Sequence, residues 1–190
     1  MKQLDTPSRH ELVPIEASDY DTIAGWLSDQ RDFVNVCGTA FSYPLDRDAF
    51  VEFFVEQAGM EASRLCYKWV ERDSRSVRGM VSFSRIDWRN DYGHLGFVAV
   101  DPTTRSQGIG SAMIESVISL GFTKHGFHRI DLVVLQSNPR ALAFYVNRVG
   151  FQHEGLMRDV LKIEGKYVGW HSLSVLKAEW LRHERKRPRR

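Results

Sequence analysis

The segment between residues 92 and 135 constrains the fold of this chain more than any other, because its hydrophobic periodicity changes twice. The runs YGHLGFVAV and HRIDLVVL are apolar and rich in branched residues, which is typical of buried strands. Between them, from Gly108 to about His125, apolar residues recur at helical spacing. A helix between two strands of one sheet is a crossover connection that joins parallel strands. We therefore expect an α/β domain with a mixed sheet that crosses over through this helix at its centre.

The remaining segments extend this pattern on both sides, in the order β-α-α-β-β-β-α-β-α-β-β, with an antiparallel first half of the sheet. Residues typical of helix ends support the assignment. These are Ser18 or Asp19, Asp46, Gly59, Asn138 with Pro139, and Gly150. The expected strands cover residues 10–17, 64–72, 77–87, 92–100, 128–135, 151–165 and 166–180, and the expected helices cover residues 18–30, 43–59, 108–125 and 138–150.

The composition is that of one globular domain, since 190 residues with 43% hydrophobic and 12% aromatic content can bury a core. Six Arg or Lys and one Glu in the last nine residues contribute +5, so the first 181 residues carry −3 although the whole chain carries +2. We expect a domain over residues 8–181 and a basic C-terminal tail over residues 182–190. The tail either contacts RNA or another polyanion or is simply solvated, and nucleic acid is not expected elsewhere.

The N-terminal stretch MKQLDTPSRHEL is polar and lacks the apolar middle of a signal peptide. No apolar run reaches the roughly 18–20 residues that a membrane span needs. Cys37 and Cys66 lie far apart without metal-type spacing, so we interpret them as free thiols in a reducing compartment. These features predict a cytoplasmic protein with no membrane contact and no metal.

The turn RSQGIG places Arg105, Gly108 and Gly110 where the central helix begins. The first N–H groups of a helix have no partner within it and lie at the positive end of its dipole. Glycines let an anion approach these groups, and Arg105 can add a charged hydrogen bond. The turn suits a pyrophosphate, although a glycine turn that only needs unusual dihedrals has the same sequence. It is neither a Walker A loop nor a complete dinucleotide fingerprint.

Two motifs together resemble the GNAT superfamily of N-acetyltransferases. The first is the strand end GFVAVDP followed by Arg-x-x-Gly-x-Gly at a helix start, and the second is the helix NPRALAFYVNRVGF. The family's second motif is occupied here by Asn138, Ala141, Phe144, Tyr145, Gly150 and Phe151. The resemblance spans nearly residues 8–180 and implies a mixed, largely antiparallel seven-stranded sheet flanked by about four helices. The beginning and the end of the chain are similar to the branch with ribosomal-protein N-terminal and spermidine acetyltransferases.

The resemblance implies acetyl-CoA as the donor. The loop amides would hold its pyrophosphate, and the strand before the loop would pair with its pantetheine arm. That strand would separate from its neighbour, often at a bulge, for which Gly96 is a suitable place. The implied cofactor-binding residues are Phe97, Val98, Val100, Arg105, Ser106, Gln107, Gly108, Ile109, Gly110, Ser111, Asn138, Ala141 and Phe144.

Tyr145 is the expected general acid. Asn138, Ala141 and Tyr145 are three and four residues apart and share one helix face. A hydroxyl beside the departing thiolate of CoA supplies a proton, and such help is worth about 10²–10⁴ in rate. The alternatives are an ordinary core tyrosine with its hydroxyl at the rim, and an Asn138 that only caps the helix.

His94 is the candidate base, in the place where many family members carry a glutamate. A histidine side chain titrates near neutral pH and can take a proton from an amine. A structural histidine, a water chain or an amine that arrives already neutral fits the sequence equally well. His153 and His171 are expected to be structural.

The expected acceptor is a small-molecule amine or a protein N-terminus. We expect the stretch DQRDFVNVCGTAFSYPLD to connect the first two helices, and it could line one side of the acceptor pocket. The side chains of Trp88 and Trp170 could line another side, although packing explains both tryptophans as well.

We expect direct transfer in a ternary complex, since neither cysteine lies in a motif that matches the site. One alternative is a catalytically inactive GNAT-like module that binds or senses acyl-CoA. Another is a nucleotide-phosphate enzyme, for which no matching Mg²⁺-holding Ser/Thr–Asp arrangement is found. Family members are often dimers, so a homodimer stays open.

Overall fold

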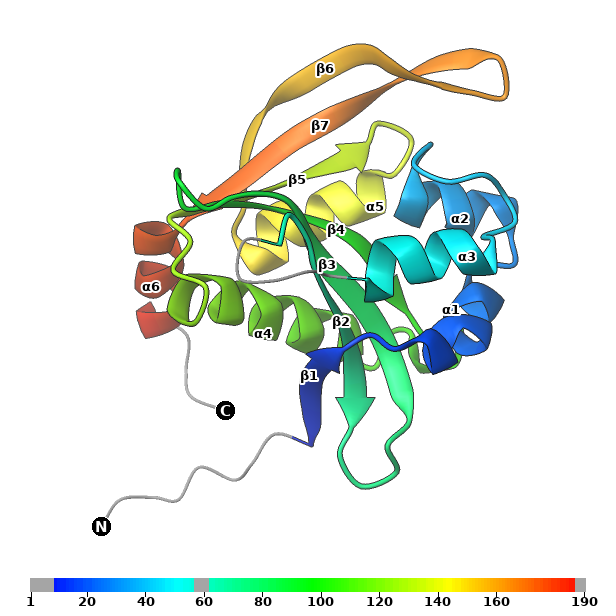
Figure 1. The fold of residues 1–190 in the computed structure, drawn as a ribbon. Helices are drawn as coiled ribbons and strands as arrows, with labels where there is room; N and C mark the ends of the chain where they lie inside the picture. Colours follow the sequence, from blue (N-terminus) through cyan, green and yellow to red (C-terminus); the bar gives the residue numbers. More distant parts are fainter. Residues whose placement is uncertain (1–8, 57–61, 187–190) are drawn as a thin grey trace.

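One mixed β-sheet forms the centre of the molecule. The computed structural model describes residues 9–56 and 62–186, with side chains described as far as Arg182. Within these residues seven strands pair in the order β1-β2-β3-β4-β5-β7-β6 (Figure 1). All neighbours are antiparallel except β4 and β5, which are parallel. This confirms the predicted crossover. The strands are β1 His10–Pro14, β2 Leu65–Glu71, β3 Val77–Asp87, β4 Tyr92–Val100, β5 Arg129–Leu135, β6 Gln152–Ile163 and β7 Lys166–Leu176.

Helices lie on both faces of the sheet. In the described part of the chain there are six α-helices, with short 3-10 segments at Ala17–Asp19 and Pro102–Thr104 and π-helical continuations at Val51–Val55 and Phe144–Val149. The helices are α1 Tyr20–Trp26, α2 Gln30–Cys37, α3 Arg47–Phe50, α4 Ile109–Thr123, α5 Pro139–Ala143 and α6 Lys177–Lys186. No helix among the described residues is long and apolar enough to cross a membrane.

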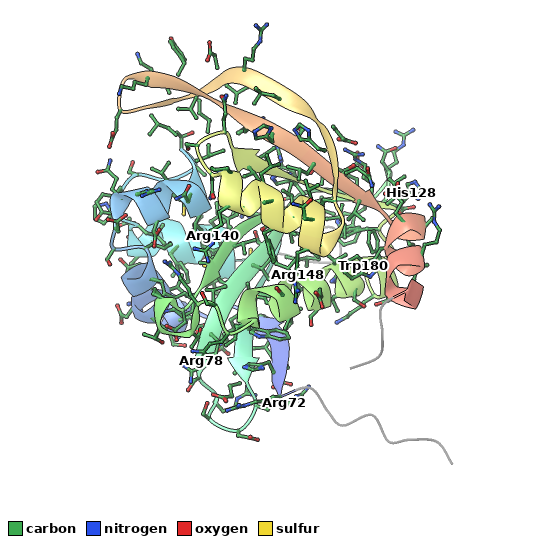
Figure 2. The ribbon with its side chains drawn as sticks, turned by 180° about the vertical axis from the view of Figure 1, so that it is seen from behind. Arg72, Arg78, His128, Arg140, Arg148 and Trp180 are labelled. Carbon is green, nitrogen blue, oxygen red and sulfur yellow. The ribbon has the colours of Figure 1, made fainter. Side chains whose placement is uncertain are left out.

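The two faces bury two separate apolar clusters. On one face α4, α5 and α6 cover the sheet, and Met113 and Val117 of α4 pack with Phe83 of β3. Figure 2 shows the molecule turned by 180° from the view of Figure 1, with α5 above α4 and Trp180 labelled on α6. On the other face α1, α2 and α3 pack Phe33 and other apolar side chains against Met80 of β3. The helices on this face lie over the half of the sheet formed by β1 to β4. The strand residues of the second cluster come from this half.

Helix α2 lies in the stretch that was expected to be a connection between the first two helices. Asp29 caps it, since its Oδ1 accepts hydrogen bonds from the N–H groups of Arg31 at 2.8 Å and Asp32 at 3.1 Å. Phe33 and Cys37 are four residues apart and are both buried in the second cluster. A helix of eight residues is marginal without tertiary packing, which explains why the local pattern did not indicate it.

Helix α6 corrects the end of the last strand, which was expected to reach residue 180. β7 ends at Leu176, and α6 follows directly through Lys186. Trp180 is 3% exposed and packs against Phe122 of α4, with ring centroids 6.5 Å apart. The beginning of the basic tail, as far as Lys186, is therefore helical. Gly59, the predicted end of the second helix, lies outside the described residues.

The cap of α2 can be tested by substitution at Asp29. We expect Asp29→Ala to lower the free energy of unfolding by about 0.5–2 kcal/mol, because two backbone N–H groups lose their acceptor. Asp29→Asn is the matched control and should change it little, since asparagine caps as well as aspartate. Urea denaturation measures both variants, and equal stabilities for all three proteins would contradict the assigned cap.

Candidate active site

A β-bulge interrupts β4 at the position predicted for it. Ser82 of β3 pairs with Gly96 and Met80 pairs with Ala99, so β4 has one residue more than β3 in this interval. Phe97 takes the strained φ of 50°, and the Ser82 hydroxyl donates to the Gly96 carbonyl at 3.2 Å. The extra residue reverses which face each side chain reaches.

Because of the bulge, side chains before and after it reach opposite faces of the sheet. Leu95 packs in the first apolar cluster, whereas Ala99 packs in the second, although both have odd numbers. Phe97 joins an aromatic group in the second cluster, with its ring centroid 4.9 Å from that of Phe53. Val98 and Val100 are half-buried against the first cluster. These three residues therefore keep their side chains in apolar contacts, and their backbone is what a ligand could use.

β4 and β5 separate after a short stretch of pairing. The parallel ladder joins Tyr92–His94 to Arg129–Asp131, and no pair follows it among the described residues. β5 itself continues to Leu135, paired with β7 on its other side. From Leu95 onward, the β5-facing edge of β4 is therefore open within the described structure. An open strand edge is a template for an extended ligand that pairs through its own amide groups.

Asp101 shapes the loop that follows β4. Its Oδ1 accepts hydrogen bonds from the Thr103 N–H at 2.9 Å and the Thr103 hydroxyl at 2.7 Å. Its Oδ2 accepts from Arg78 of β3 at 3.2 Å. Burial raises the pKa of Asp101, but the hydrogen bonds from Thr103 and Arg78 outweigh it and lower the pKa below its ordinary value. The carboxylate stays ionised and ties the loop to the sheet.

The amino end of α4 is built to present backbone N–H groups. The first intrahelical hydrogen bond described there runs from the Ala112 N–H to the Gly108 carbonyl at 3.1 Å, so the N–H groups of Ile109, Gly110 and Ser111 precede it. Gly108 has a φ of 81°, and a Cβ placed there would meet no atom within 4 Å. The space that a side chain would fill is open, which fits an anion held by these amides.

Arg105 has a partner that the sequence did not indicate. Its Nη2 lies 2.8 Å from Oδ2 of Asp32 on α2, and both side chains are partly exposed. A contact from Arg105 to a phosphate would have to share or replace this ion pair. Ser106 and Gln107 are exposed, and Gln107 donates to the Thr103 carbonyl at 3.4 Å.

Helix α5 carries the second predicted motif. Asn138 caps it, since its Oδ1 accepts from the Ala141 N–H at 3.1 Å, and its Nδ2 donates to Oδ1 of Asn35 on α2 at 3.3 Å. The capping role of Asn138 is thus confirmed, while a cofactor contact stays a prediction. Ala141 is half-buried on the same face. Helix α2 therefore contacts both motifs, through Arg105 of the loop and Asn138 of α5.

Tyr145 lies where α5 widens into a π-helical turn, a feature that often occurs at functional sites. It is 8% exposed and packs edge-on against Phe144 at 5.1 Å and Phe151 at 5.7 Å. Burial raises its pKa well above the ordinary value, so the hydroxyl keeps its proton at neutral pH. Tyr145 shares its apolar cluster with Leu95, Val98 and Val100 of β4.

His94 is buried on β4, directly opposite Asp131 of β5. Its Nδ1 lies 2.6 Å from Oδ1 of Asp131, and the Tyr92 hydroxyl donates to the same oxygen at 2.8 Å. Asp131 and Tyr92 were not expected at the site from the sequence. The available signal was a charged residue inside the apolar run IDLVVL, where an unpartnered carboxylate is costly.

The other candidate residues take structural positions. Trp88 donates from Nε1 to the Ala62 carbonyl at 3.0 Å and packs near Phe127, and Trp170 donates to the sulfur of Met157 at 3.1 Å. His153 and His171 pair with each other across the β6–β7 hairpin, with Nε2 and Nδ1 2.9 Å apart. Cys37 and Cys66 are buried thiols outside any disulfide, and burial raises the pKa of each to about 12.

Comparison with known proteins agrees with this geometry. The family model described as "Acetyltransferase (GNAT) family" matches residues 31–151, more than half of the chain. This chain therefore belongs to the GNAT acetyltransferase family.

Relatives and solved structures extend the comparison over most of the chain. An uncharacterized N-acetyltransferase, p20 from Bacillus licheniformis, is 24% identical over 174 residues, which are 90% of this chain and 95% of that protein. The putative ribosomal N-acetyltransferase YdaF from Bacillus subtilis strain 168 is 28% identical over 105 residues, 55% of this chain and 56% of that protein. The structure of spermidine N-acetyltransferase from Vibrio cholerae in complex with CoA and spermine has a TM-score of 0.78 at 20% identity, covering 92% of this chain and 99% of that one.

The loop assignment predicts that a β-branched residue at Gly108 impairs CoA binding. Gly108→Val forces a side chain into left-handed backbone and over the free N–H groups. We expect the affinity for acetyl-CoA to fall by about tenfold or more, the equivalent of one lost charge-assisted hydrogen bond. Isothermal titration calorimetry measures the change.

Gly126→Val is the matched control for this prediction. Gly126 has a φ of 77° and equally open surroundings, but it lies in the turn after the carboxyl end of α4. It should lose stability to a similar degree and keep its affinity for acetyl-CoA. Equal affinities of the two variants would contradict the loop assignment.

Proposed function

We propose that this protein transfers the acetyl group of acetyl-CoA to a primary amine by direct transfer in a ternary complex. The observation that carries the proposal is the continuity between the open edge of β4 and the free N–H groups at the start of α4. An extended pantetheine arm would pair along Phe97, Val98 and Val100, and the diphosphate that follows it would reach the loop amides. An acyl-CoA combines an extended amide chain with a diphosphate, as this arrangement requires.

The donor would supply an activated acetyl thioester, and Tyr145 would supply the proton for the leaving sulfur. The amine nitrogen forms a bond to the acetyl carbon, and the carbon–sulfur bond breaks with its electron pair on sulfur. Sulfur takes the proton of the Tyr145 hydroxyl, and the surplus proton of the nitrogen restores that hydroxyl. Burial raises the pKa of Tyr145 and keeps its hydroxyl protonated at neutral pH, so the hydroxyl can donate a hydrogen bond to the leaving sulfur.

The two cysteines support direct transfer and argue against an acyl-enzyme. Cys37 and Cys66 are 5% and 1% exposed, and their thiols stay protonated at neutral pH. Only the thiolate is an effective nucleophile. The amine would therefore attack the thioester itself.

The acceptor is either a small-molecule amine or a protein N-terminus. One neighbour binds spermine and one relative is named a ribosomal N-acetyltransferase, which supports an amine in both cases. The domain limits at residues 8–181, the basic tail, the cytoplasmic location, the absence of a metal and a homodimer remain predictions from the sequence.

The proposal is tested by measuring release of CoA thiol with a panel of polyamines, amino acids, aminoglycosides and N-terminal peptides. We expect release that depends on one class of amine and reaches saturation. Calorimetry with CoA runs in parallel. CoA binding without release for any amine would show that the protein is a binding or sensing module, and no CoA binding would refute the proposal.

Tyr145→Phe tests the general acid. We expect kcat to fall by about 10²–10⁴ while the affinity for acetyl-CoA stays within about twofold, because the ring and its packing remain. Tyr67→Phe is the control, because it also removes a tyrosine hydroxyl. Tyr67 lies on β2, and its hydroxyl is 2.9 Å from Nε2 of His125. Steady-state kinetics and calorimetry measure both variants, and a wild-type kcat in Tyr145→Phe would remove the acid role.

A further inference from the structure

A carboxylate is placed between two apolar residues in the centre of the sheet. Asp131 of β5 lies between Ile130 and Leu132, which are 0% and 3% exposed, and its own side chain is 22% exposed. Its Oδ1 lies within hydrogen-bonding distance of both His94 and Tyr92 of β4. Placing a charge at such a site is costly unless it has partners, and both partners come from the neighbouring strand.

The position of this group coincides with the short β4–β5 ladder. His94 and Asp131 are the last pair before the two strands separate. The parallel register therefore fixes the two side chains side by side, at the point where β4 and β5 cease to pair.

The hydrogen bond to Asp131 determines the tautomer of His94. An ionised carboxylate only accepts, so Nδ1 of the ring carries the hydrogen that lies between them. In the neutral ring the lone pair is then on Nε2. Nε2 lies 3.8 Å from the point that a Cβ of Gly96 would occupy, so the ring extends along β4 towards the bulge. The basic nitrogen faces the segment where the strand edge opens.

The surrounding charges are largely paired with one another. Arg129 of β5 forms a bidentate ion pair with Glu154 of β6, at 2.7 and 2.6 Å. The charge of Arg85 on β3 lowers the pKa of Tyr92, but less than burial and Asp131 raise it. Burial and then the hydrogen bond to Asp131 raise the pKa of Tyr92 to about 12, so it remains a neutral donor. On α2, which also packs against β4, Asp32 is paired with Arg105 and Arg31 is exposed. Asp131 is the carboxylate in direct contact with the ring.

We propose that His94 and Asp131 form a catalytic dyad, in which Nε2 of His94 takes the proton of the acceptor ammonium and Asp131, held by Tyr92, positions the ring. The inference rests on the proposed function and names two residues beyond it. Asp131 and Tyr92 are positioning residues, since they act through His94.

The proton balance is complete. The ammonium gives one proton to Nε2, and the charged ring is stabilised by Asp131. The neutral amine then reacts through the steps given for Tyr145, and His94 passes its proton to solvent. An ammonium ion and a thioester become an amide, a thiol and one proton.

The first measurement is the tautomer of His94, which does not depend on activity. A ¹H–¹⁵N correlation spectrum of the imidazole nitrogens identifies His94 by the signal lost in His94→Gln. We expect hydrogen on Nδ1 in the wild type and a changed pattern in Asp131→Asn. Hydrogen on Nε2 in the neutral wild-type ring would overturn the dyad, whether or not an acceptor amine has been found.

The second measurement is the pH dependence of kcat/KM with the amine identified by the panel. We expect Asp131→Asn to lower kcat about 10²–10⁴-fold at neutral pH with an unchanged KM for acetyl-CoA. In His94→Gln the rate should rise tenfold per pH unit up to the pKa of the free amine, because only amine that is already neutral can react. Wild-type profiles in both variants would overturn the proposal.

Two further variants keep the test decisive. Tyr92→Phe removes one donor to Asp131, and we expect a loss of about tenfold or more in kcat with intact acetyl-CoA affinity. It replaces Asp131→Asn should that variant fail to fold, and a wild-type kcat would then count against the dyad. Asp87→Asn is the matched control, because it removes a carboxylate at the end of β3 and asparagine can keep its two hydrogen bonds from backbone N–H groups. It should match the wild type in tautomer and in rate.

Discussion

The separation of β4 from β5 is the constraint on which the rest of the site depends. The two strands pair over three residues, and the bulge at Gly96 then turns β4 away. Three features follow from this one irregularity. The edge of β4 becomes available for an extended ligand, the loop after β4 delivers the amino end of α4 to the same edge, and His94 with Asp131 lies at the point of divergence. A regular ladder through Val100 would remove the first of these features outright.

Most of the proposed cofactor contacts use the backbone, and the side chains have a different task. Phe97 packs into the aromatic group of the second cluster, and Val98 and Val100 pack into the first. These contacts hold the bulged strand in place from both faces of the sheet. In the loop, Asp101 accepts hydrogen bonds from Thr103 and Arg78, which hold the loop against the sheet. The proposed cofactor contacts therefore depend on the course of the backbone more than on the identity of these side chains.

Local patterns in the sequence were sufficient for most elements. All seven strands and the crossover were predicted, as were the caps at Asp46 and Asn138 and the left-handed end at Gly150. Helices α2 and α6 were not. Phe33 stabilises α2 and Trp180 stabilises α6, because each is buried against residues distant in the chain. Trp180, for example, packs against the ring of Phe122. Periodicity over two or three turns is weak when capping residues and charges are interspersed, so packing decided these two elements.

The sequence by itself determined the fold class, the glycine turn at the start of α4 and the helix that carries Tyr145. Each of these is encoded by residues within about ten positions of one another, through periodicity, caps and glycine dihedrals. The tertiary structure decided which side chains meet. His94 and Asp131 are 37 residues apart, and Arg105 and Asp32 are 73 apart. Their contacts exist because the β4–β5 register and the packing of α2 on the sheet bring them together, and no local pattern encodes a register between distant strands.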